Sequence, residues 1–98
     1  MNINLDYEGF ETCMVNRWTE KIILGVHYIF KFENNYGASV VKTDFSYGGD
    51  QDLWELAVIR FNSYDNYELD YDTPITNDVI GYLTNDEVKE LLQQIKEL

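Results

Sequence analysis

The residues of this chain that could do chemistry are mainly carboxylates, and many of them lie in the second half of the sequence. No Lys or Arg occurs between Arg60 and Lys89. Gathered carboxylates attract hard cations or basic protein surfaces. The sequence therefore offers two kinds of site, a metal site and a protein-binding surface. The acids of this interval are Asp65, Glu68, Asp70, Asp72, Asp78, Asp86 and Glu87.

A metal site finds little support in the spacing of these acids. A further group, Asp50, Asp52 and Glu55, follows two glycines, but it does not fit the twelve-residue calcium loop with its central glycine and final glutamate. Asp70 and Asp72 are two residues apart, so a strand would place them on one face, where they could share an ion. Loose binding of a cation remains an alternative, but we predict no dedicated metal site and no cofactor.

Other residue types that do catalysis are scarce. The one histidine, His27, falls within a predicted strand, where a lone histidine is usually a surface or structural residue. The one cysteine, Cys13, has no basic neighbour in sequence, and we expect it to be a small core residue. The chain has no phosphate-binding glycine loop, no Gly-x-Ser-x-Gly and no His-Glu-x-x-His motif. We therefore predict no catalytic residues and no enzymatic activity.

Tyrosines interleave with the acids and add candidate contact residues, because tyrosine is frequent at interface hot spots. Tyr67 and Tyr71 alternate with acids and are expected to point into the core, as is Trp54. Tyr36, Tyr47 and Tyr64 fall in loops or turns and are freer to make contacts. The residues predicted to bind a partner are Tyr47, Asp50, Asp52, Tyr64, Asp65, Glu68, Asp70 and Asp72.

The overall charge limits the kind of partner. The 98 residues include 18 acidic and 7 basic side chains, a formal net charge of -11. We expect no direct nucleic-acid binding and no membrane binding, because affinity for both comes from Lys and Arg. Basic protein surfaces, including the basic grooves of DNA-binding enzymes, are the attracted partners. Solubility alone would explain the same composition.

A row of acids can also imitate the phosphates of DNA. A strand would place Glu68, Asp70 and Asp72 on one face about 7 Å apart, which is half the charge density of one DNA strand. Mimicry would need a second aligned row, such as the acids of residues 50–55 or those of the C-terminal helix. A DNA mimic, another interface and a merely solvated face therefore remain as alternatives.

An α+β fold, with an antiparallel sheet of about five strands packed against C-terminal helices, would position these residues. Residues 16–21, 34–37, 46–52 and 62–66 are predicted turns or loops, because they are rich in turn-forming residues. Residues 53–61 are apolar on both faces, as expected of a central strand covered on both sides. Alternating apolar and polar side chains predict strands over 10–17, 22–32 and 67–72, and a strand over 38–43 would complete a hairpin with 22–32.

Two helices are predicted after Pro74. Thr76 is a candidate N-cap for a short helix through Tyr82. Thr84 and Glu87 form a capping box for the last helix. Its residues Val88, Leu91, Leu92, Ile95 and Leu98 make one apolar stripe that must pack against the sheet. The whole chain, residues 1–98, is predicted to be a single domain without repeats or linkers.

The same residues suggest a compartment. One cysteine allows no intramolecular disulfide, which suits a reducing cytoplasm. Residues 1–6 have neither a basic start nor an apolar run, so we expect no signal peptide. The apolar runs are too short for a membrane-spanning helix. We therefore predict a cytoplasmic protein.

Five stretches of the chain carry a resemblance to known proteins: 35–41 (NYGASVV), 46–49 (SYGG), 53–58 (LWELAV), 71–79 (YDTPITNDV) and 81–83 (GYL). Together they resemble a family of small, mostly uncharacterised bacteriophage proteins. The resemblance implies a phage or prophage origin and a bacterial host cytoplasm, and it brings no catalytic residues.

Small acidic phage proteins are often accessory proteins that bind and inhibit host machinery, anti-CRISPR and anti-restriction proteins among them; this is an argument by association. We therefore expect a non-enzymatic accessory protein that binds a basic surface of a host protein. A structural protein that forms a homo-oligomer is the alternative, and a metal-dependent enzyme ranks third.

Overall fold

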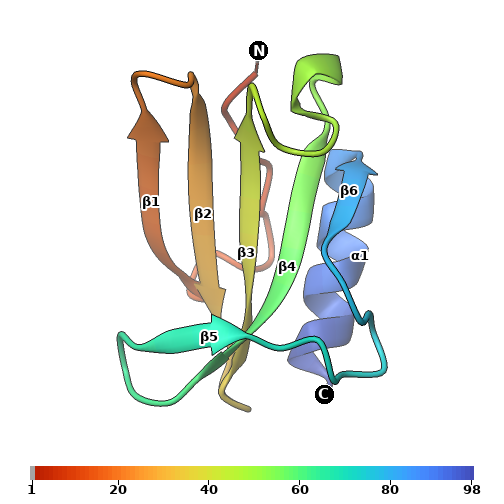
Figure 1. Ribbon diagram of the computed structural model, residues 1–98. Coiled ribbons are helices and arrows are strands. Elements are labelled where there is room, and N and C mark those ends of the chain that lie inside the picture. The colour runs from red at the N-terminus through yellow and green to blue at the C-terminus, as the bar shows by residue number, and fades with distance from the viewer. Residues whose placement is uncertain (1) are drawn as a thin grey trace.

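In the computed structural model, which describes residues 2–98, the chain forms one antiparallel sheet followed by one α-helix (Figure 1). Met1 lies outside the described residues. The elements in chain order are β1 Met14–Glu20, β2 Gly25–Lys31, β3 Tyr36–Thr43, the 3₁₀ turn η1 Gly49–Gln51, β4 Trp54–Phe61, β5 Tyr67–Leu69, β6 Ile80–Leu83 and α1 Asn85–Lys96.

The strands follow one another across the sheet in the order β1-β2-β3-β4-β5, each antiparallel to its neighbour. The outer edge of β4 is shared by two short strands. Strand β5 pairs with Ile59–Phe61 at one end of β4, and β6 pairs with Trp54 and Leu56 at the other. The predicted α+β fold with an antiparallel sheet is confirmed, but among the described residues one α-helix packs on the sheet where two helices were expected.

One face of the sheet forms the main core. Val26, Tyr28 and Phe30 alternate along β2 and are at most 2% exposed. Helix α1 lies behind this face in Figure 1 and contributes the predicted apolar stripe. Within that stripe Val88 and Leu92 are fully buried. Trp54 is buried at the start of β4, as the sequence predicts.

Side chains fix both ends of α1: residues of its own first turn at the N-terminal end, and a residue of the β2–β3 turn at the C-terminal end. The predicted capping box is present: Glu87 N–H donates to the Thr84 hydroxyl at 3.3 Å, and Thr84 N–H donates to Glu87 Oε1 at 3.0 Å. These bonds satisfy N–H groups that the first helical turn leaves unpaired. At the other end the Asn34 amide donates to the carbonyl oxygens of Ile95 at 2.9 Å and Leu98 at 3.1 Å. The β2–β3 turn is thereby attached to the helix.

The N-terminal segment, residues 2–13, is held to the same face of the sheet by polar contacts of buried residues. The Tyr28 hydroxyl accepts from Leu5 N–H at 3.2 Å and donates to the Ile3 carbonyl oxygen at 2.9 Å. The ammonium of Lys42, whose side chain is 3% exposed, donates to the Asn2 carbonyl oxygen at 2.9 Å. It also lies 4.2 Å from the centroid of the Trp54 ring, a cation–π contact.

Three sequence predictions for the first 32 residues need correction. The predicted turn over 16–21 is mostly strand, because Asn16–Glu20 pair with β2. The turn of this hairpin covers residues 21–24, so the strand predicted over 22–32 begins only at Gly25. The predicted strand over 10–17 begins only at Met14, since a turn joins Phe10 to Cys13 through a backbone hydrogen bond. The outer strand is largely exposed, so it lacks the apolar alternation that marks half-buried strands.

The predicted short helix from Thr76 to Tyr82 is also wrong. The Thr76 hydroxyl accepts from Asp78 N–H at 3.1 Å, which closes a local turn in place of a helix cap. Strand β6 follows and pairs with β4. Gly81 is needed there, because a Cβ at this position would lie 2.4 Å from the Tyr47 Cβ. Tertiary pairing thus overrides a weak local helix signal.

Candidate functional site

The segment that follows β4 is the most exposed acidic part of the chain. We name residues 62–72, which include β5, the β5 arm. Its charged side chains are Asp65, Glu68, Asp70 and Asp72, with no Lys or Arg among them. In Figure 1 the arm crosses in front of one end of the sheet, on the face opposite α1. The arm therefore brings together five of the eight residues predicted to bind a partner, namely Tyr64 and these four acids.

Aromatic and aliphatic side chains of the β5 arm are also exposed. Tyr64 is 82% exposed, Leu69 51%, Tyr71 39% and Tyr67 38%. The prediction that Tyr67 and Tyr71 point into the core is wrong. Strand β5 is only three residues long and pairs with one end of β4, so its side chains have no second layer to pack against. The arm thus offers apolar contact area and negative charge on the same segment.

The charges of the β5 arm are partly balanced by one cation from β4. The Arg60 guanidinium lies 3.2 Å from Glu68 Oε1 and 3.8 Å from Asp70 Oδ2. Asp70 is only 14% exposed and also accepts from Asp72 N–H at 2.9 Å. Among the described residues, Asp65 and Asp72 take part in no ion pair. The expected row of three equivalent solvated acids is therefore uneven, with Asp70 mostly occupied by contacts within the protein.

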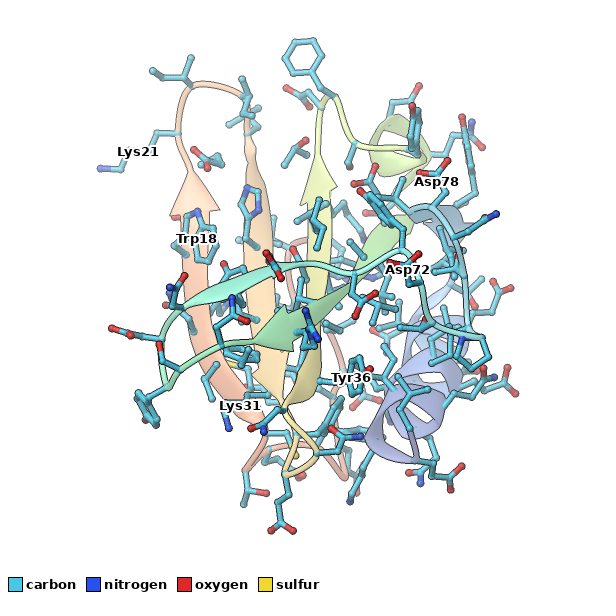
Figure 2. All side chains as sticks on the ribbon, turned by 60° about the horizontal axis from the view of Figure 1, so that its bottom comes forward. Trp18, Lys21, Lys31, Tyr36, Asp72 and Asp78 are labelled. Atoms are coloured by element: carbon cyan, nitrogen blue, oxygen red, sulfur yellow. The ribbon has the colours of Figure 1, made fainter. Side chains whose placement is uncertain are left out.

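An open groove of about 550 Å³ runs beside these residues. Its walls are mostly polar, and Arg60 lies among its acids. Figure 2 labels two of the residues that border it, Tyr36 from β3 and Asp72 from the arm. The full lining is Tyr36, Arg60, Glu68, Leu69, Asp70, Tyr71 and Asp72.

The other predicted contact residues, Tyr47, Asp50 and Asp52, lie elsewhere. They precede β4, whereas the β5 arm follows it, so the two groups lie near opposite ends of an eight-residue strand. Such a strand is about 23 Å long at about 3.3 Å per residue. The acids of residues 50–55 therefore do not form a second row beside those of the arm.

Within this second group, Asp52 has a structural role. Its carboxylate accepts from Lys42 Nζ at 3.0 Å and from Asn2 N–H at 2.8 Å. The hydrogen bond from Asn2, and next the one from Lys42, lower the pKa of the Asp52 carboxyl below its ordinary value of 3.8. Tyr47 stays 58% exposed, and its N–H donates to Glu55 Oε1 at 2.9 Å.

The surroundings of His27 and Cys13 fit structural roles for both residues. The His27 imidazole stacks on the Trp18 indole with centroids 4.7 Å apart and planes at 4°. Its Nε2 lies 3.3 Å from Glu20 Oε1 but makes no hydrogen bond there, so the contact is an ion pair only when the imidazole is protonated. Cys13 is partly buried against the main core.

Comparison of the chain with protein-family models, with curated proteins and with solved structures finds no match. Within residues 2–98 no group of three or more His, Cys, Asp and Glu side chains is placed to hold a metal ion. No described helix is long and apolar enough to cross a membrane.

Four basic residues form no ion pair within residues 2–98, and three of these four lie on the β1–β2 hairpin. Arg17 is on β1, Lys21 is in the turn and Lys31 ends β2. Figure 2 shows Lys21 and Lys31 on one side of the molecule and Asp72 and Asp78 on the other.

Sequence reasoning missed Arg60 as part of the acidic surface, although a signal for it exists. A five-residue turn over 62–66 makes Phe61 face Tyr67 and therefore Arg60 face Glu68, the register that the structure has. It also missed a small hollow beneath the β5 arm, which has an unpredicted β-bulge at Val15 in its wall.

Proposed function

We propose that this chain is a non-enzymatic binding protein that docks on a basic surface of another protein through the β5 arm. The observation that carries the proposal is the coincidence, on one segment, of the exposed carboxylates of Asp65, Glu68 and Asp72 with the exposed side chains of Tyr64, Leu69 and Tyr71. Acidic side chains steer a basic partner, and half-exposed tyrosines supply contact area at little cost in conformational entropy. A merely solvated face would not need the aromatic residues.

The sequence resemblance to phage proteins suggests where such a partner would be found. On that basis we propose a host protein of a bacterial cell, with a nucleic-acid-binding surface as the most basic kind of target. Inhibition would follow from occupation of that surface. The separation of the two acidic groups along β4 supports docking by the arm more than imitation of a long DNA segment.

The proposal is tested by capture from a bacterial lysate with three forms of the chain. The arm variant is Asp65→Asn, Glu68→Gln and Asp72→Asn. The control variant is Glu8→Gln, Asp44→Asn and Glu90→Gln, which removes the same charge from exposed acids outside the arm. We expect a basic protein to be recovered by the wild type and the control variant, and not by the arm variant.

The affinity of the recovered protein is then measured with purified components at 50 and 300 mM NaCl. We expect binding to weaken steeply at the higher salt concentration, because screening shortens the reach of surface charges. Equal loss of binding in both variants would mean that net charge alone attracts the partner. Recovery that is unchanged in the arm variant would remove the arm from the interface.

A homo-oligomer is the second candidate, and the exposed edge of β1 favours it. Strand β1 ends the sheet, and its outer edge pairs with no described strand. Val15 is 45% and Trp18 is 37% exposed there. An unpaired edge strand is a template for pairing with another chain. Light scattering of the wild type and of Thr19→Pro discriminates, since a wild-type monomer at all concentrations excludes this assembly.

A further inference from the structure

The hollow beneath the β5 arm has the chemistry of a site for one side chain. Its volume is about 120 Å³, well below the roughly 300–1,000 Å³ of pockets for small molecules. It lies on the sheet face opposite α1, between β1 and the tip of the arm. The lining residues are Val15, Asn16, Ile29, Phe61, Tyr64, Asp65 and Tyr67.

The strands and the arm each supply a different part of this hollow. Ile29 and Phe61 are at most 6% exposed and form a fixed apolar floor. The Tyr67 ring packs against Phe61 with centroids 5.3 Å apart. A β-bulge makes Val15 the extra residue of β1 between the pairs Met14–Phe30 and Asn16–Ile29, and bulges of this kind redirect side chains.

The polar part of the lining is negative. Asp65 is exposed, takes part in no ion pair among residues 2–98, and belongs to the acidic β5 arm. Aromatic rings together with a carboxylate favour a cation that also has an apolar stem. Lys31 of the chain already places its ammonium 5.6 Å from the centroid of Phe61, so one ring of this hollow attracts a cation within the molecule.

We propose that the hollow receives an arginine side chain of the basic partner, an inference that rests on the proposed function. A guanidinium is planar and weakly hydrated, stacks on aromatic rings and forms forked hydrogen bonds with a carboxylate. Tyr64 and Tyr67 would supply the rings and Asp65 the carboxylate. The arginine methylenes would pack against Val15 and Ile29.

The test uses NMR titration of the full chain with N-acetylarginine methylamide and with its neutral isostere, N-acetylcitrulline methylamide. We expect saturable shifts at Val15, Asn16 and Tyr67 with the arginine probe, and at least about tenfold weaker binding of the citrulline probe, equivalent to about 1.4 kcal/mol. N-acetyllysine methylamide should bind more weakly than the arginine probe. Equal affinity for the arginine and citrulline probes would overturn the proposal.

The chain offers closely matched variants for this titration. Tyr67 and Tyr71 are 38% and 39% exposed, and both belong to the arm, but Tyr67 lines the hollow and Tyr71 does not. Tyr67→Ala should weaken arginine binding about fivefold or more, whereas Tyr71→Ala should leave it unchanged. Lys31→Met should strengthen binding, because it removes a competing positive charge. Equal effects of the two tyrosine variants would contradict the proposal.

Failure of this inference is distinguishable from failure of the proposed function. If a basic protein binds the arm in a salt-sensitive manner but Tyr67→Ala binds it as well as Tyr71→Ala does, the arm is the interface and the hollow is not its anchor. If the arginine probe saturates the hollow but no basic protein requires the acids of the arm for binding, the arginine site is supported and the proposed basic partner is excluded.

Discussion

At the scale of single residues, polar atoms near the main core hold the N-terminal segment in place. Lys42 and Tyr28 come from adjacent strands, and each contacts main-chain atoms of residues 2–5. Their bonds replace hydration that burial removes, so losing one partner costs more than the bond itself contributes. Asp52 extends the same set by accepting from both Lys42 and Asn2.

The first prediction concerns Asp52 and pH. Its pKa is lower in the folded chain than its ordinary value of 3.8, so its bonds stabilise the fold fully above that pH and are lost as the pH falls through the folded pKa. Asp52→Asn should therefore lower Tm at pH 7 by a few degrees. The difference from wild type should shrink below about pH 3.8.

The exposed neighbour Asp50 provides the control for this experiment. Asp50→Asn changes the same charge on the same 3₁₀ turn, without the contacts to Lys42 and Asn2. Thermal melts of both variants across pH 2.5 to 7 make the comparison. A constant difference between Asp52→Asn and wild type at every pH would contradict the part assigned to the Asp52 carboxylate.

The second prediction concerns the Tyr28 hydroxyl. Tyr28→Phe should destabilise the fold by about 1–3 kcal/mol, because it leaves Leu5 N–H and the Ile3 carbonyl oxygen without their partner. Denaturant unfolding measures the loss, and hydrogen exchange should increase in residues 2–7. Tyr64→Phe removes the same group from a side chain that is 82% exposed, and it should change neither result. Equal effects of the two variants would argue against this anchoring contact.

At the scale of elements, the β5 arm is held to the sheet by few contacts. Three pairs link β5 to β4, one further backbone bond joins Asp70 N–H to the Val58 carbonyl oxygen at 2.9 Å, and Arg60 supplies the ion pairs. Segments with few buried contacts open at low free-energy cost. The arm should therefore be less protected from exchange than β2, β3 and β4.

The third prediction follows from Arg60. Arg60→Met should raise the exchange rate of the Asp70 amide about two- to fivefold, corresponding to about 0.5–1 kcal/mol for a half-exposed ion-pair network. Lys21→Met changes net charge equally but lies in the β1–β2 turn, away from the arm, and should leave that rate unchanged. The same acceleration in both variants would mean that net charge, and not the Arg60 contact, sets the opening of the arm.

The elements that sequence reasoning predicted are those whose own residues carry a strong pattern. The last helix was predicted from the capping box of Thr84 and Glu87, and the structure has it. Strand β2 was predicted from apolar alternation, β3 from the turn at residues 34–37, and β4 from a run of residues that is apolar on both faces. These signals are local, so they are visible before folding.

The parts that were missed depend on contacts between distant segments. Strand β6 exists because it pairs with β4, and its positive-φ residue Tyr82 gives no local strand signal. Tyr67 was assigned to the core because alternation alone does not reveal that β5 lacks a covering layer. The hollow beneath the arm needs β1, β2, β4 and the arm together, so no single stretch of sequence predicts it.

At the scale of the whole molecule, the excess of negative charge acts on stability as well as on binding. A formal charge of -11 on 98 residues repels itself in the folded state more than in the expanded unfolded chain. Three of the seven basic residues pair with acids, namely Lys42, Arg60 and Lys89, whereas Lys21 lies in the β1–β2 turn. Ion pairs of so few cations do not remove the excess of negative charge.

The fourth prediction is that salt stabilises this fold. Raising NaCl from 0.01 to 0.15 M shortens the screening length from about 30 Å to about 8 Å and should raise Tm by about 2–4 °C, equivalent to about 0.5 kcal/mol. Thermal melts at constant pH measure the effect. The variant Glu8→Gln, Asp44→Asn and Glu90→Gln should show a smaller increase. A Tm that falls with NaCl would mean that attractive ion pairs outweigh the repulsion.

The division of the outer edge of β4 between two short strands has a consequence for how such a protein can diversify. None of residues 62–72 contributes to the main core, and β6 holds the other end of β4 independently. Insertions or deletions in this stretch should leave α1 packed on the sheet, provided that the new segment still covers Ile59 and Phe61. One short run of codons can therefore be rewritten for a new target while the scaffold is inherited intact.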